Sequence, residues 1–342
     1  MNNNPNKSII VWLLSGCLLI FLMVIIGGIT RLTNSGLSMV DWKLIMGSIP
    51  PIGEEAWQKT FEQYQQFPEY QMVNNHFTLS EFKSIFFWEY FHRLLGRLIG
   101  LVFMVPFIYF LVKKKLSKKL TLQCIIILGM GALQGTIGWW MVKSGLVKDP
   151  DVSHFRLAIH LITAFITFAY TFWVALNLIY PENKSEFTGV RKVGFLLCGV
   201  TILQIVYGAF VAGLNAGFVM NTWPKMGTQW FDDSAFAMQP LWLNFIEGIG
   251  GVQFVHRYLA YAVVGLVVYL WLKTRKLDLN DLQAKGVKML LFVVLFQFTL
   301  GVFTLILAVT IWLGVAHQLG AFLLLTAVVF VMNTFKKGVS IS

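Results

Sequence analysis

Residues 88–97, WEYFHRLLGR, open an apolar run that continues to about residue 112. A run of roughly 20 apolar residues is long enough to cross the hydrocarbon core of a bilayer as a helix. The stretch therefore predicts a membrane helix with a Glu, a His and two Arg gathered near its start. Similar runs recur along the chain, and the eight predicted spans are residues 9–30, 88–112, 120–142, 155–180, 190–212, 250–272, 286–309 and 312–333.

The composition is also that of a membrane protein. The chain has 342 residues, of which 57% are hydrophobic and 13% charged, whereas a soluble domain carries about 25% charged residues. The first span lacks a small-residue cleavage site, so we expect a mature helix rather than a signal peptide. The segment MNNNPNKS is not an Arg-rich transit peptide, which favours a bacterial cell membrane. The predicted fold class is an all-α polytopic membrane protein.

The charges alternate between the two sides of the predicted spans. The net charge is +11, but the positive-inside rule accounts for the excess of Lys and Arg without an acidic or nucleic-acid partner. One side holds Lys7, Lys113, Lys114, Lys115, Lys118, Lys119, Lys184, Arg191, Lys192, Lys273, Arg275, Lys276, Lys285, Lys288, Lys336 and Lys337. The other holds Asp41, Glu54, Glu55, Glu62, Glu69, Glu81, Asp149, Asp151, Asp232 and Asp233. Both termini are therefore predicted to be cytoplasmic.

The sequence repeats itself once. GGITRLTNSGLSMVDW (27–42) aligns with GAFVAGLNAGFVMNTW (208–223), EYFHRLLG (89–96) with QFVHRYLA (253–260), and LQGTIGWW (133–140) with FQFTLGVF (296–303). Each copy holds four spans, an even number, so the copies are expected to have the same orientation in the membrane. The prediction is two parallel four-helix-bundle repeats, with an N-terminal half of residues 1–184 and a C-terminal half of residues 185–342.

The first outer loop, residues 31–87, is longer than its counterpart in the second half. Its segment EEAWQKTFEQYQQF places Trp57, Phe61 and Tyr64 on one helical face, which predicts an amphipathic helix lying on the membrane surface. Thr78 and Glu81 form a candidate capping box ahead of the second span. A solvated lid with no chemical role is the alternative interpretation of this loop.

The three cysteines, Cys17, Cys124 and Cys198, all lie within predicted spans. Structural disulfides in an outer loop are therefore not expected. We expect the three thiols to be small buried hydrophobic groups.

Four of the six histidines occupy equivalent places, one near the outer end of each even-numbered span: His92, His160, His256 and His317. Ionisable groups in membrane spans are costly and usually functional. A single His could instead hydrogen-bond across a helix interface. Two His from separate helices in each half are typical of haem bound in a bundle, one imidazole on each side of the iron.

Small residues near these histidines are expected to let a flat macrocycle approach the backbone. They are Gly96, Gly100, Gly248, Gly250, Gly251, Gly314 and Gly320.

Arginines near the same outer surface are candidates for binding the haem propionates. Arg93 and Arg257 each follow a candidate ligand, and Arg31 and Arg97 lie close by in sequence. A guanidinium matches a carboxylate in a bidentate fork. Snorkelling toward lipid headgroups is the alternative role for any one of them.

The two halves differ at one position that bears on chemistry. Glu89 precedes His92 by three residues, and Gln253 precedes His256 by three, so each shares a helix face with its His. Only the first half can exchange a proton or hold a negative charge there, which favours a reacting pocket in that half. The alternative is that Glu89 only complements the positive end of a helix N-terminus.

These residues together resemble the haem A synthase family, in the form found in proteobacteria, related bacteria and mitochondria. The resemblance covers essentially the whole chain. It is carried by GGITRLTNSGLSMVDWK, PEY, FKSIFFWEYFHRLLGR, LQGTIGWWMVKSGL, HFRLAIHL, GAFVAGLNAG with NTWPKM, QFVHRYLAY and AHQLGAF.

The resemblance implies oxidation of the C8 methyl group of haem O to a formyl group, giving haem A for cytochrome oxidase. It implies that His92 and His160 flank the substrate haem, that His256 and His317 ligate haem b, and that Glu89 is the catalytic carboxylate. The cysteine pairs that some family members carry in the outer loops are missing here. The sequence shows no nicotinamide, flavin or iron–sulfur motif, so an external electron acceptor is expected.

Expected partners are haem O, membrane lipid, the electron acceptor and an enzyme that makes haem O; an oligomer is compatible with the sequence. Two other functions share the four histidines: a di-haem b-type electron-transfer subunit, and a haem transporter or chaperone. Glu89 opposite Gln253 argues against a passive electron carrier, and a transporter would need access from both faces.

Overall fold

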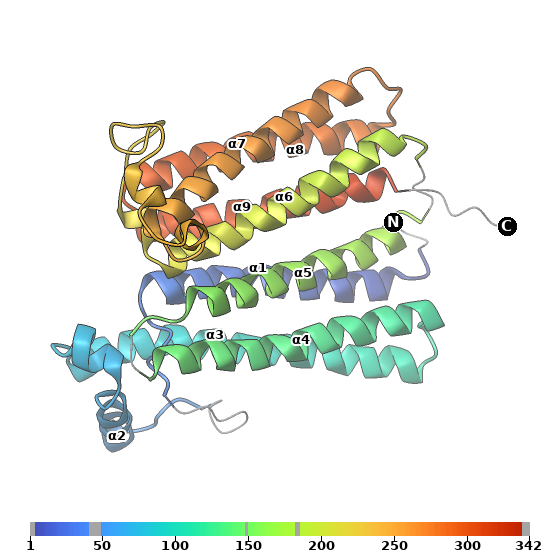
Figure 1. Cartoon of the computed structure of the whole chain (residues 1–342). Helices are drawn as coiled ribbons and strands as arrows, with labels where there is room; N and C mark the ends of the chain where they lie inside the picture. Colours follow the sequence, from blue (N-terminus) through green and yellow to red (C-terminus); the bar gives the residue numbers. More distant parts are fainter. Residues whose placement is uncertain (1–3, 41–48, 148–149, 182–184, 337–342) are drawn as a thin grey trace. The chain divides into compact units, whose positions relative to one another are not determined.

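The computed structural model describes residues 4–40, 49–147, 150–181 and 185–336. Within these ranges the regular structure is helical, apart from an isolated bridge between Met226 and Gln229. Eight of the described helices are long and apolar enough to cross a membrane (Figure 1): α1 (Lys7–Leu32), α3 (Leu79–Val112), α4 (Lys118–Gly145), α5 (His154–Ile179), α6 (Thr188–Gly213), α7 (Ile249–Thr274), α8 (Asp281–Ile306) and α9 (Ile311–Thr334). The protein is a multi-pass α-helical membrane protein, as predicted.

Each predicted span corresponds to one of these helices, and the largest difference is at α3. This helix begins at Leu79 rather than at residue 88. Thr78 Oγ1 accepts a hydrogen bond from the Glu81 N–H (3.4 Å), and Glu81 Oε2 accepts one from the Thr78 N–H (2.7 Å). The predicted capping box is thus confirmed, and it starts α3 itself.

The longer α3 changes the interpretation of Glu89. This residue lies well beyond the first turn of the helix. The favourable effect of a helix N-terminus on a negative charge falls off within that turn. The alternative role for Glu89, as a simple complement to the helix end, therefore loses its basis.

The predicted amphipathic helix is α2 (Glu54–Tyr64), and its apolar face is buried by protein. Trp57, Phe61 and Tyr64 pack against Phe82 and Phe86 in the first turns of α3. The Trp57 and Phe86 ring centroids lie 5.0 Å apart at 77°, an edge-to-face contact. The additional turns of α3 supply the apolar surface that covers α2. The apolar face of α2 therefore packs on protein, whereas we expected it to face the membrane. The π-helical turn η2 (Tyr70–Asn74) follows.

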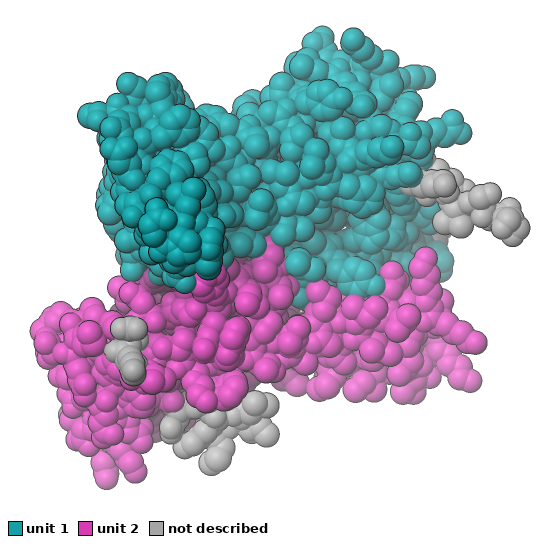
Figure 2. Space-filling model, in the orientation of Figure 1, with its two compact units in different colours: residues 1–17, 165–342 teal, residues 18–164 magenta. Residues whose placement is uncertain are grey.

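The chain forms two compact units (Figure 2). Unit 1 comprises residues 1–17 and 165–342, and unit 2 comprises residues 18–164. In unit 1, α6 packs on α7, α7 on α8, α8 on α9 and α9 on α6, which closes a four-helix ring. Its core is aliphatic, with Leu197, Leu270, Leu290 and Val328 almost fully buried.

Several sequence predictions fall outside the described residues. They include the predicted boundary at residue 184 and the side of the membrane assigned to Asp41, Asp149, Lys184 and Lys337. The division into halves at that boundary stays a prediction. The three cysteines lie in α1, α4 and α6 and are free thiols.

The connection between α6 and α7 contains three short 3-10 helices, η3 (Ala216–Phe218), η4 (Asp233–Phe236) and η5 (Leu241–Phe245). Asn244 is fully buried and holds this connection together. Its side chain accepts a hydrogen bond from the Met238 N–H (2.8 Å) and donates to the carbonyls of Met238 and Leu241 (both 2.9 Å).

Candidate functional site

Four membrane helices each present one histidine to a glycine on the membrane helix before it. His92, His160, His256 and His317 lie on α3, α5, α7 and α9. The facing glycines are Gly27 on α1, Gly138 on α4, Gly208 on α6 and Gly301 on α8. A Cβ atom at these four positions would lie 3.2, 3.2, 3.2 and 2.7 Å, respectively, from the imidazole Cε1. The glycines therefore let each ring pack directly against the neighbouring backbone.

In unit 1 the imidazoles of His256 and His317 lie close together. Their ring centroids are 6.4 Å apart and their planes are inclined at 82°. A first-row metal at about 2 Å from one nitrogen of each ring would leave the two ring centres roughly 6 Å apart. The spacing fits one iron held between two imidazoles.

The surrounding donors also fit a haem better than a bare metal ion. Within the described ranges there is no group of three or more His, Cys, Asp or Glu side chains arranged to hold a metal ion. A haem brings four ring nitrogens of its own and needs only the two axial ligands. The Nε of Arg257 is buried, with no hydrogen-bond partner among the described residues. Such a donor is suited to a carboxylate such as a propionate.

Some of the predicted small residues have a different role from the one expected. A Cβ on Gly251 would lie 2.1 Å from the Asn244 carbonyl oxygen, and one on Gly250 2.4 Å from Ser234 Oγ. These two glycines admit the α6–α7 connection, so the prediction that they make room for a macrocycle is wrong. Gly320 likewise admits the side chain of Gln297.

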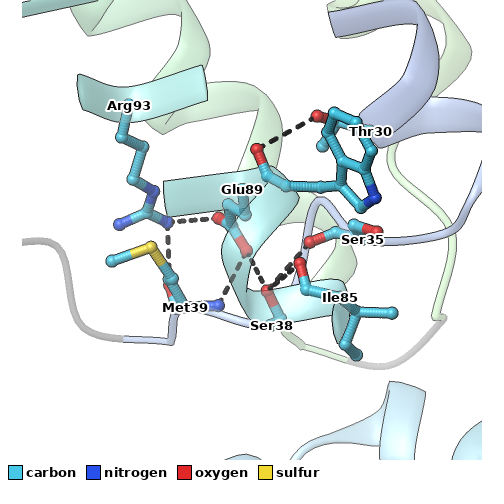
Figure 3. Close-up of polar contacts among 8 residues, drawn as sticks. Thr30, Ser35, Ser38, Met39, Ile85, Glu89 and Arg93 are labelled. Atoms are coloured by element: carbon cyan, nitrogen blue, oxygen red, sulfur yellow. Dashed lines mark hydrogen bonds and ion pairs between the residues drawn. The ribbon is translucent and has the colours of Figure 1, made fainter. Parts of the chain in front are cut away.

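Glu89 lies in a polar cage formed by the segment after α1 (Figure 3). Its Oε2 accepts hydrogen bonds from Ser38 Oγ (2.8 Å) and the Met39 N–H (2.7 Å), and its Oε1 pairs with Arg93 Nη2 (2.6 Å). Arg93 Nη2 also donates to the Met39 carbonyl (2.7 Å). The carboxylate is buried, and its charge is balanced by a guanidinium one helical turn away.

Gln253 occupies the equivalent place in unit 1 and shares the arginine contact, but it donates hydrogen bonds where Glu89 accepts them. Its Nε2 donates to the carbonyls of Ala216 and Val219 (both 2.7 Å), and its Oε1 accepts from Arg257 Nη2 (3.0 Å). Arg257 also donates to the Met220 carbonyl. Asn34 and Asn215 both adopt left-handed backbone conformations, at φ 49 and 54, ahead of the two cages. The same scaffold thus carries a carboxylate in one unit and an amide in the other.

The candidate arginines have several partners. Arg93 pairs with Glu89, and Arg257 donates a hydrogen bond to Gln253. Arg31 Nη2 lies 3.6 Å from Asp151 Oδ1, and its Nη1 donates to Asn34 Oδ1 (3.3 Å). Arg97 is half-buried on α3, one turn beyond Arg93. The structure therefore brings Arg93 to Glu89, and Arg31 to a different carboxylate.

A second buried carboxyl group, Glu69, lies in the connection between α2 and α3 and was not predicted as a site residue from the sequence. Its Oε2 accepts a hydrogen bond from the Tyr64 hydroxyl (3.0 Å), and that hydroxyl accepts one from Asn74 Nδ2 (2.9 Å). Burial raises the pKa of Glu69 to about 8, and the charges of Glu89 and Asp151 act in the same direction. The Tyr64 hydroxyl and Arg31 oppose this rise. The motif PEY could have signalled this residue, but its burial could not be read from the sequence.

We expect replacement of Glu69 by Gln to remove a pH dependence of stability. The folded state keeps Glu69 protonated up to about pH 8, whereas the unfolded chain ionises it near pH 4.3. The folded protein therefore binds the extra proton between these values, and stability falls as the pH rises through this window. Wild-type Tm should decline between pH 5 and 8.5 by more than that of Glu69→Gln, a stability difference on the order of a few kcal/mol.

Thermal unfolding in detergent at several pH values measures this difference. Glu62→Gln, an exposed carboxyl on α2, is the matched control and should follow the wild type. Parallel Tm profiles for the wild type and Glu69→Gln would contradict the assigned protonation.

The chain is similar to several known proteins along most of its length. The COX15-CtaA family model, described as "Cytochrome oxidase assembly protein", matches residues 10–329. A protein of Flavobacterium psychrophilum named heme A synthase is 56% identical over 97% of this chain and 99% of its own length. A heme A synthase of Nitrosospira multiformis is 44% identical over 97% of this chain and 94% of its own. A protein of Arabidopsis thaliana named heme A synthase COX15 is 43% identical over 96% of this chain and 74% of its own.

Proposed function

Since the chain belongs to the COX15-CtaA family of cytochrome oxidase assembly proteins, we propose that it is a haem A synthase. It is a membrane-bound oxidoreductase that converts a methyl group of haem O into the formyl group of haem A. The observation that carries this function is the pair of equivalent cages, each beside a candidate iron ligand, with an ionisable carboxyl group in only one of them.

The C-terminal half holds a resident haem b between His256 and His317. The 6.4 Å spacing of these rings supports the assignment. The N-terminal half holds the substrate haem between His92 and His160, whose contacts with Gly27 and Gly138 match those of the other pair. Arg257 binds a propionate through its buried Nε, and Arg31, Arg93 and Arg97 are the corresponding cations in the N-terminal half.

Glu89 is the proton acceptor in this proposal. Oxidation of a methyl to a formyl group with an oxygen atom from water releases four protons and four electrons (R–CH3 + H2O → R–CHO + 4 H+ + 4 e−), and a carboxylate beside the pocket can accept a proton. The Ser38 hydroxyl, the Met39 N–H and Arg93 fix the orientation of this carboxylate. A haem b held between His256 and His317 would supply one-electron chemistry, and an external acceptor would be needed for the electrons.

The protein acts in the bacterial cell membrane with both termini in the cytoplasm, because the charges of the connecting segments follow the positive-inside rule. The histidines then lie toward the outer leaflet. An enzyme that makes haem O is a suitable partner, because the substrate is too apolar to cross water freely.

The decisive experiment is an analysis of the haems in the pure protein. The protein is supplied with haem O and an oxidant, and the extracted haems are separated and identified by mass. A haem A synthase should yield a formyl haem together with retained haem b. Two equivalent b-type haems and no formyl product with any acceptor would instead indicate an electron-transfer subunit.

A further inference from the structure

Three of the four histidines have a glutamine partner from the preceding membrane helix. In each case the Gln lies four residues before the glycine that faces the imidazole: Gln134 before Gly138, Gln204 before Gly208, and Gln297 before Gly301. Residues four apart share one face of a helix. The glycine admits the ring, and the amide contacts it one turn away.

The two contacts in unit 1 are nearly identical. Gln204 Nε2 lies 3.2 Å from His256 Nδ1 and 3.0 Å from the His256 carbonyl oxygen. Gln297 Nε2 lies 3.2 Å from His317 Nδ1 and 2.9 Å from the His317 carbonyl oxygen. Each amide therefore bridges the ring and the backbone of one histidine.

The third contact is in unit 2 and follows the same pattern. When the Gln134 amide is turned to satisfy all its neighbours, its nitrogen lies 3.2 Å from both His160 Nδ1 and the His160 carbonyl oxygen. Its oxygen then accepts hydrogen bonds from Thr163 Oγ1 (2.6 Å) and the Ala164 N–H (3.0 Å).

The fourth copy lacks the amide. Met23 stands four residues before Gly27, and its Cε would lie 3.4 Å from a Cβ on Gly96. A Cβ on Gly27 would lie 3.5 Å from His92 Nδ1, so this nitrogen faces α1 as its counterparts face their helices. His92 Nδ1 is nevertheless buried without a hydrogen-bond partner among the residues that the structure describes.

A partner at Nδ1 matters because it acts through the ring on the other nitrogen. When Nε2 of a neutral imidazole binds iron, Nδ1 carries the proton and can donate it to an acceptor. The oxygens of Gln204 and Gln297 are buried without partners among the described residues, so each can serve as that acceptor. With iron on Nε2, the amide must present its oxygen to the Nδ1 proton and give up the hydrogen bond of its nitrogen to the histidine carbonyl. Such a hydrogen bond fixes the ring and strengthens it as a ligand.

We infer that Met23 makes His92 the exchangeable axial ligand, while Gln134, Gln204 and Gln297 are positioning residues that hold the other three imidazoles in place. This inference rests on the proposed function, in which the N-terminal half must admit one haem and release its product. The C-terminal half must keep its haem, and both of its imidazoles carry the amide. His92, the imidazole without a glutamine partner, thus belongs to the N-terminal half, where a ligand must dissociate from the iron before the product haem can leave.

The test compares haem loss from the two halves. The full-length protein is loaded with iron protoporphyrin IX and mixed with excess apomyoglobin, and the transfer of haem is followed by absorbance. We expect two phases, and the His256→Ala variant, which retains only the N-terminal site, should identify the fast one. Met23→Gln should slow the fast phase by about 10–100-fold, the usual effect of such a partner on metal affinity.

Two further variants guard against general effects on folding. Met23→Leu, which conserves volume and apolarity, should leave the fast phase unchanged. Gln204→Leu should accelerate the slow phase by about 10–100-fold. The midpoint potential adds a readout that a merely structural role would not move: Met23→Gln should lower that of the N-terminal haem, and Gln204→Leu should raise that of the C-terminal haem.

The inference is overturned if Met23→Gln and Met23→Leu lose haem at the same rate, or if Gln204→Leu leaves the slow phase and its potential unchanged. Both results would leave the proposed function standing, because the wild type would still hold two haems. A wild-type protein that forms no formyl haem from supplied haem O would instead overturn the proposed function, and this inference with it.

Discussion

The Glu89→Gln variant is expected to bind its haems and yet form no detectable haem A. Removal of a positioned acid–base group typically lowers a rate by roughly 10²–10⁴-fold. The amide keeps the size of the side chain and can still accept a hydrogen bond from Arg93, but it cannot take up a proton. The measurement is the yield of formyl haem from supplied haem O, together with the spectrum of the retained haem b.

The C-terminal cage shows that an amide side chain can pair with the arginine one turn away. Gln253 already occupies the equivalent cage, where its Oε1 accepts a hydrogen bond from Arg257 at 3.0 Å. The reverse change, Gln253→Glu, is the matched control, because it places a carboxylate in the C-terminal cage without touching the N-terminal one. Formation of haem A at the wild-type rate by Glu89→Gln would exclude Glu89 as the proton acceptor.

The second large effect is expected for His256→Ala. This change removes one of the two rings that lie 6.4 Å apart and so removes one axial ligand of the proposed haem b. Haem content should fall by about one equivalent per chain, and the low-spin spectrum of the C-terminal haem should disappear. Pyridine haemochrome analysis of the pure variant measures the content directly.

His76→Ala is the control for this experiment, since His76 is exposed in the connection before α3. It should keep both the haem content and the spectrum of the wild type. An unchanged bis-imidazole spectrum in His256→Ala would mean that a different side chain ligates the iron.

The membrane helices and the four histidines were predictable because their signals are local. Apolar runs mark the spans, and the internal repeat places each of His92, His160, His256 and His317 near the same end of a helix. The start of α3 was misplaced by the apolar pattern, because Leu79–Phe87 contains polar residues and gains its helical stability from the cap at Thr78 and from packing against α2.

The cages could not be derived from the sequence. Ser38 and Met39 reach Glu89 across about fifty positions of chain, and such a contact depends on how the segment after α1 folds back. The Gln partners were partly visible, because LQGTIGWW and FQFTLGVF align Gln134 with Gln297. Their role could be inferred only from the structure, which shows the histidine ring that each amide contacts. The exception at Met23 is noticeable only after the other three contacts are known.

The continuity of α3 links α2 to the candidate proton acceptor and iron ligand. One unbroken helix carries the docking surface for α2 at Phe82 and Phe86 and, within two turns of Phe86, Glu89 and His92. A displacement of α3 at the histidine would therefore also move the surface on which α2 packs. We expect an environment-sensitive dye at Gln58, exposed on α2, to change its emission when haem binds, without any label near the reacting groups; an unchanged emission would mean that α2 does not follow the haem site.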